Sequence, residues 1–112
     1  YKRWAWLREE RRRQAGVRRR DVAWAVAQRA AMCLKDEFNA THVVVYGSLT
    51  HGHWFGPRSD IDLAAEGIPP ALFWRAWCAL DQIDRSFEIN LVALESDTES
   101  LRRVIEQEGV EL

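Results

Sequence analysis

Two aspartates stand two residues apart in the middle of the chain, at Asp60 and Asp62. The segment 61–65 is short and apolar apart from Asp62, which is typical of a β-strand. On a strand, residues i and i+2 project from the same face, about 6–7 Å apart along the chain. Two carboxylates at that spacing repel each other. A divalent cation with hard oxygen ligands, such as Mg²⁺, would relieve that repulsion.

A second polar feature, Gly47-Ser48, follows the β-branched run 42–46. A glycine at the end of a buried strand allows a tight turn and a close approach of the backbone to a ligand. Backbone amides after such a turn can hold a phosphate, and Ser48 adds a hydroxyl donor. The sequence therefore predicts a phosphate cradle beside a metal-binding carboxylate pair.

Residues 44–52 and 59–63 together resemble the signature of the polymerase-β-like nucleotidyltransferases, and the short length resembles the minimal nucleotidyltransferases. The family has Gly-Ser, about ten residues, and then Asp-x-Asp; here eleven residues separate Ser48 from Asp60. The resemblance covers roughly residues 40–112. It implies that Asp60 and Asp62 hold the metal, and that Gly47, Ser48 and Ser59 contact the nucleotide.

The family also supplies a third carboxylate from a later strand, directly before an apolar pair. Asn90 occupies that place here, before Leu91-Val92, and it cannot act as a base. Glu88 lies two residues earlier on the same expected strand face. We therefore predict Glu88 as the third metal-binding and catalytic acid, with Asn90 beside it as the alternative occupant of the third position.

Proteins that look like this one often are the antitoxin of a two-component system whose toxin is a HEPN-type ribonuclease. The resemblance implies a Mg²⁺-dependent (or Mn²⁺-dependent) transfer of AMP from ATP to a toxin tyrosine, within a hetero-oligomeric complex in the cytoplasm. Two alternatives remain open. The chain could be an inactive antitoxin that neutralises its toxin by binding, or a nucleic-acid-binding module that uses its basic N-terminal segment.

Several other residues invite a role at this site. His51, His53 and Arg58 could touch phosphates, while Trp54 and Phe55 could stack on a base or meet a partner. Trp74 and Trp77 are expected in the core instead. The two cysteines, Cys33 and Cys78, have no spacing that predicts a zinc site.

The elements expected to position these residues form an α/β (α+β) fold of the polymerase-β-like kind, in the order α-α-β-β-α-β-α. Hydrophobic periodicity and turn residues predict helices over 2–14, 19–38, 70–82 and 97–108, and strands over 42–46, 61–65 and 87–94. Gly16 is expected to separate the first two helices. The strands should form a small, mixed, three-stranded sheet.

Length and composition fit this interpretation. With 112 residues and 47% apolar residues, the chain is expected to be one domain, with N-terminal helices over 1–39 and a catalytic core over 40–112. No apolar run reaches the length of a membrane span, and no signal peptide is visible. The net charge is −1, yet residues 1–20 carry nine Lys or Arg against two Glu. That asymmetry predicts contact with an acidic surface, a phosphate or a partner, or a solvated helix face.

Overall fold

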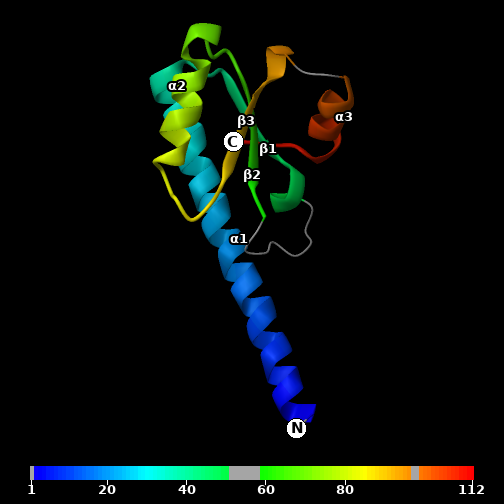
Figure 1. Ribbon diagram of the computed structural model, residues 1–112. Helices are drawn as coiled ribbons and strands as arrows, with labels where there is room; N and C mark the ends of the chain where they lie inside the picture. Colours follow the sequence, from blue (N-terminus) through cyan, green and yellow to red (C-terminus); the bar gives the residue numbers. More distant parts are fainter. Residues whose placement is uncertain (1, 51–58, 97–98) are drawn as a thin grey trace.

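The computed structural model describes residues 2–50, 59–96 and 99–112; of the first helix, it describes the side chains of Arg11 and of residues from 18 onward. Within these residues, three α-helices accompany a four-stranded mixed sheet of order β3-β2-β1-β4 (Figure 1). The expected α+β class is confirmed. No helix in the described ranges is both long and apolar enough to cross a membrane.

The central strands follow the sequence pattern closely. Strand β1 (His42–Tyr46) pairs antiparallel with β2 (Ile61–Glu66), and β2 pairs in parallel with β3 (Ile89–Ala93). Strand β3 is shorter than the predicted 87–94, because its end passes into a 3₁₀ turn at Leu94–Ser96. Along β2, Ile61 and Leu63 are buried while Asp62 lies on the opposite face, as the alternation predicts.

Helix α1 (Lys2–Phe38) corrects the prediction of two helices, since it runs through Gly16 without a break. A glycine inside a helix costs about 1 kcal/mol relative to alanine. The helix-forming arginines and alanines on either side offset that cost. Figure 1 shows the N-terminal part of α1 extending well beyond the sheet. Its C-terminal half carries the buried stripe that packs on the sheet: Ala23, Val26, Ala27, Ala30, Ala31 and Leu34.

Helix α2 (Pro70–Asp81) matches the prediction to one residue and lies with α1 on the same face of the sheet. The Trp77 indole packs against the core and donates Nε1–H to the Ile89 carbonyl at 3.0 Å. Trp74 is 70% exposed, so its predicted place in the core is wrong. It lies about 100° around the helix from Phe73, at the margin of the stripe that packs on the core, and its ring meets the Trp77 ring edge to face.

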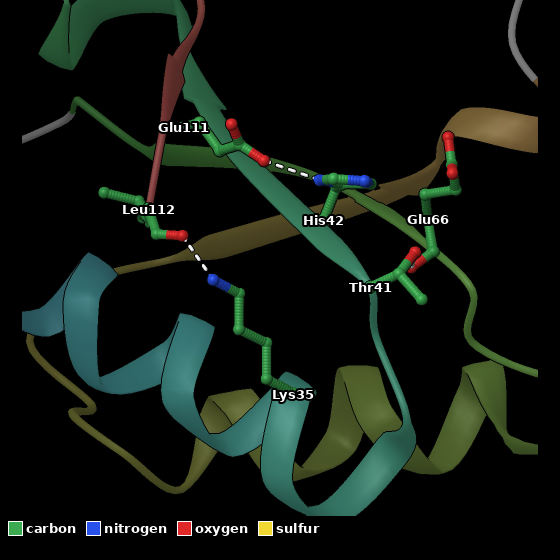
Figure 2. A network of polar contacts seen from close by, with 6 residues as sticks. All are labelled: Lys35, Thr41, His42, Glu66, Glu111 and Leu112. Atoms are coloured by element: carbon green, nitrogen blue, oxygen red, sulfur yellow. Dashed lines mark hydrogen bonds and ion pairs between the residues drawn. The ribbon is translucent and has the colours of Figure 1, made fainter.

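Helix α3 (Glu99–Glu108) covers part of the other face, and residues 97–98 of the predicted helix lie outside the described residues. Strand β4 (Val110–Glu111) then adds a fourth strand beside β1, which corrects the three-stranded prediction. Two residues are too short to show an alternating pattern in sequence. A cross-strand contact between Glu111 Oε1 and His42 Nδ1 (2.6 Å) and a hydrogen bond from Lys35 Nζ to the Leu112 carbonyl hold β4 in place (Figure 2).

Candidate active site

Three polar side chains meet where the parallel strands β2 and β3 begin. The parallel register sets Asp62 directly beside Asn90, and Asp60 lies just before β2. Asn90 Nδ2 donates to Asp62 Oδ1 at 3.2 Å and to Asp60 Oδ2 at 3.4 Å. All three residues are half-buried. The amide therefore lies between the two carboxylates that the sequence singled out, and it offsets part of their mutual repulsion.

The environment of Asp62 disfavours its charge. Burial raises the pKa of the Asp62 carboxyl above its ordinary value, the Asn90 hydrogen bond lowers the pKa, and the nearby Asp60 charge raises it again. The balance is a raised pKa, so the folded protein without a cation pays a cost for ionising this group. A cation bound between the aspartates would reverse that balance.

Gly47 forms the wall of the site on the β1 side. It opens a 3₁₀ turn, Gly47–Leu49, directly after Tyr46, the residue that pairs with Asp62. Its φ of +78° lies in the left-handed region, and a Cβ added there would stand 2.6 Å from Asp62 Oδ2. Only glycine fits both demands. Gly47 thus lies directly against the Asp62 carboxylate.

The turn is held by its own hydrogen bonds. Thr50 donates both its backbone N–H (3.0 Å) and its Oγ1–H (2.9 Å) to the Gly47 carbonyl. Ser48 is exposed, so its hydroxyl is accessible from solvent. Ser59, the third predicted nucleotide contact, is half-buried and directly precedes Asp60. Gly47 therefore lies against Asp62 and Ser59 directly before Asp60, while the nucleotide contacts of Gly47, Ser48 and Ser59 stay predictions.

Glu88, the predicted third acid, lies directly before β3. Its carbonyl accepts the Ile61 N–H at 2.9 Å, which fixes its backbone beside Asp60, and its side chain is exposed. Among the described residues, no group of three or more His, Cys, Asp or Glu side chains is placed to hold a metal ion. Asn90, rather than Glu88, contacts both aspartates, so the role of Glu88 stays a prediction. The other loop candidates, His51, His53, Trp54, Phe55 and Arg58, lie outside the described residues.

An apolar cavity of about 530 Å³ lies away from this site, between α2, β3 and the start of α3. None of the predicted site residues lines it. Its lining residues are Ile68, Pro70, Phe73, Leu91, Val92, Ala93, Glu95, Ser96 and Leu101. The polar constellation at Asp60 and Asp62 is therefore the candidate for chemistry.

Sequence reasoning missed two arginines that reach the backbone next to this site, Arg19 and Arg20 on α1. Arg20 Nη2 donates to the Leu49 carbonyl at 2.8 Å, and Arg19 Nη2 donates to the Ser86 carbonyl at 3.1 Å. Nothing in the sequence distinguishes them, because they belong to a segment with nine basic residues. These two arginines are distinguished only by the path of α1, which passes the ends of β1 and β2 (Figure 1).

No known family model and no curated protein matches the chain. Similarity appears among solved structures. A toxin–antitoxin structure with AMP-PNP matches at 20% identity and a TM-score of 0.64, covering 76% of this chain and 70% of that chain. The tri-AMPylated Shewanella oneidensis HEPN toxin in complex with MNT antitoxin matches at 17% identity and a TM-score of 0.60, covering 80% and 70%. An MntA–HepT toxin–antitoxin structure matches at 17% identity and a TM-score of 0.59, and the match covers 79% of this chain and 69% of that chain.

At these identities the likeness establishes the fold. The chain has the minimal nucleotidyltransferase fold that occurs in MNT–HEPN toxin–antitoxin structures, which confirms the fold expected from the sequence.

Proposed function

We propose that the chain is a nucleotidyltransferase antitoxin that transfers AMP from ATP to a tyrosine hydroxyl of a HEPN-type ribonuclease toxin and so neutralises it. The observation that carries this proposal is the cluster of Asp60, Asp62 and Asn90, with Gly47 lying against the Asp62 carboxylate, in this fold. The similar structures support the partner and the reaction, since one contains an AMPylated HEPN toxin and another contains AMP-PNP.

The donor set fits Mg²⁺. Asp60 and Asp62 supply carboxylate oxygens, and rotation of the Asn90 amide would present its carbonyl oxygen in place of Nδ2, so every ligand would be a hard oxygen. Such an ion supplies charge neutralisation for the nucleotide phosphates.

The chain's own residues then have distinct parts. Gly47 and Ser48 bind the β- and γ-phosphates through the turn, and Ser59 adds a hydroxyl on the other side of Asp60. The tyrosine oxygen attacks the α-phosphorus, the bond from that phosphorus to the β-phosphate bridging oxygen breaks, and pyrophosphate leaves. Glu88, exposed beside Asp60, accepts the tyrosine proton.

A second function is favoured by one observation. Asn90 stands where the family has an acid, and it ties both aspartates together through a neutral amide. A chain that has lost the third acid could neutralise a HEPN toxin by binding alone. The two functions differ in whether the toxin gains AMP.

The deciding experiment is intact mass spectrometry of a HEPN toxin co-purified with the chain, before and after incubation with ATP and Mg²⁺. The transferase predicts a mass increase of one or more AMP groups on the toxin. The double variant Asp60→Asn/Asp62→Asn should slow the transfer by at least on the order of a hundredfold, because the metal-binding charge is lost. Asp81→Asn, an exposed aspartate of α2, is the matched control.

AMP transfer that persists in the double variant would rule out this site as the catalytic one. A toxin that stays unmodified but inactive in the wild-type complex would establish the binding antitoxin instead. Peptide mapping of the modified toxin identifies the acceptor residue and counts the AMP groups.

A further inference from the structure

Neighbouring arginines of α1 reach the two backbone segments that flank the candidate site. Arg20 donates to the Leu49 carbonyl, the last residue of the Gly47–Leu49 turn. Arg19 donates to the Ser86 carbonyl, and its guanidinium lies 4.3 Å from the centre of the Phe87 ring, just before Glu88 and β3. Two successive residues of α1 thus contact both the Gly47–Leu49 turn and the segment that leads into β3 and Asn90.

The Arg20 contact is strong by geometry. At 2.8 Å, it is a short bond from a charged donor, and both the Arg20 side chain and its surroundings are partly buried. Hydrogen bonds from charged donors are about twice as strong as neutral ones. Leu49 itself is fully buried, so the turn is fixed on one side by packing and on the other by Arg20.

These hydrogen bonds engage two carbonyl groups of the turn. The Gly47 carbonyl accepts from Thr50, and the Leu49 carbonyl accepts from Arg20. Both carbonyl oxygens, which would repel a phosphate, are therefore engaged within the protein. The positive charge of the Arg20 guanidinium beside the turn also favours an anion nearby.

We propose that Arg20 is a positioning residue for nucleotide binding, which fixes the Gly47–Leu49 turn in its phosphate-binding conformation from outside the site. This inference rests on the proposed function, since it assigns a specific residue to hold the nucleotide-binding turn. In this role Arg20 acts through the Leu49 carbonyl.

Arg29 offers a matched control on the same helix. Its Nη2 donates to the Ile83 carbonyl at 3.4 Å, so it makes the same kind of contact with a turn that carries no site residue. Arg20→Met and Arg29→Met both remove one guanidinium–carbonyl bond and keep a long apolar stem. A purely structural role predicts similar effects of the two substitutions on the site.

The first readout needs no nucleotide. Amide hydrogen exchange measures the opening of the Thr50 N–H, which bonds to the Gly47 carbonyl. Arg20→Met should speed exchange at Thr50 on the order of tenfold, while Arg29→Met should leave Thr50 unchanged. Equal exchange at Thr50 in the two variants would overturn the proposal.

The second readout is the dissociation constant for AMP-PNP with Mg²⁺, measured by titration calorimetry. Arg20→Met should weaken binding roughly five- to tenfold, and Arg29→Met should bind as wild type does. Arg20→Lys keeps the charge and a donor, so its dissociation constant for AMP-PNP should lie between those of wild type and Arg20→Met. If Arg20→Met does not fold, Arg20→Lys serves for both measurements.

The outcomes separate the two levels of inference. Wild-type protein that binds no AMP-PNP would overturn the proposed function, and the positioning role with it. Wild-type binding that Arg20→Met and Arg20→Lys leave unchanged would overturn the positioning role alone.

Discussion

At the scale of one residue, the ionised Asp62 side chain lowers the stability of the fold in which it lies. Its carboxyl has a raised pKa, chiefly because half-burial removes water from the charge. An acid whose pKa is raised on folding binds its proton more tightly in the native state than in the unfolded state. Stability therefore falls as the pH rises from the ordinary carboxyl pKa through the raised one, and the loss is complete above the raised pKa.

We expect Asp62→Asn to raise the thermal unfolding midpoint of the metal-free protein at pH 7, because the substitution removes the buried charge and keeps the shape. At a pH below the ordinary carboxyl pKa the gain should vanish, since Asp62 is then neutral in both states. Scanning calorimetry at several pH values measures the difference between variant and wild type.

The control for this prediction is Asp81→Asn, which removes an exposed charge from α2. It should show no comparable gain. A variant at Asp62 that is less stable than wild type at pH 7 would mean that the Asn90 hydrogen bond outweighs the cost of burial.

Much of the site could be predicted from residue types because short-range rules determine it. Alternation along β2 places Asp60 and Asp62 opposite Ile61 and Leu63, and the left-handed φ of Gly47 is a property of glycine. The placement of Asn90 between the aspartates depends on the β2–β3 register, which is set by tertiary packing. For the same reason, the sequence could not say whether Asn90 or Glu88 completes the site.

At the scale of the elements, β1, β2 and α2 were predictable because each has a strong pattern bounded by turn residues. The corrections at α1 and β4 have a related origin, because in each case the local sequence signal was outweighed by its surroundings or was too short to recognise. Gly16 is a weak helix breaker among strong helix formers, and β4 has only two residues. The stability of β4 comes from contacts distant in sequence, such as Glu111 with His42.

Because α1 is continuous at Gly16, we expect Gly16→Ala to stabilise the helix there by about 0.5–1 kcal/mol. The reason is the lower backbone entropy of alanine in the unfolded chain. Amide exchange around residue 16 should slow accordingly, and far-ultraviolet circular dichroism should show equal or greater helicity. Faster exchange around residue 16 in the alanine variant would indicate that the chain needs glycine there for a bend.

At the scale of the whole molecule, the charges are segregated. Residues 1–20 carry a net charge of +7, so the remaining seven basic and fifteen acidic residues carry −8. The basic part coincides with the N-terminal part of α1, which extends beyond the sheet in Figure 1. Among the side chains that the structure describes, the first buried one along the chain is Ala23. The described residues at the end of this basic stretch, Arg19 and Arg20, bond to the body of the fold.

A chain lacking residues 1–17 should therefore keep its fold, with a free energy of unfolding within about 1 kcal/mol of the full chain. It retains Arg19, Arg20 and the whole buried stripe of α1. Urea unfolding followed by tryptophan fluorescence provides the comparison. A loss of several kcal/mol would show that the extended part of α1 packs on the body in a way that contributes to its core.

The register that joins Asp62 to Asn90 also constrains how such a site can evolve. The same alternation buries Ile61 and Leu63, so shifting the pairing by one residue would turn the apolar side chains outward and the aspartates inward. The site cannot migrate along the sheet without loss of the fold. It can only be altered in place, by exchanging one side chain for another of similar size. A single exchange at Asp60, Asp62 or Asn90 can consequently change the polar cluster while the sheet keeps its pairing.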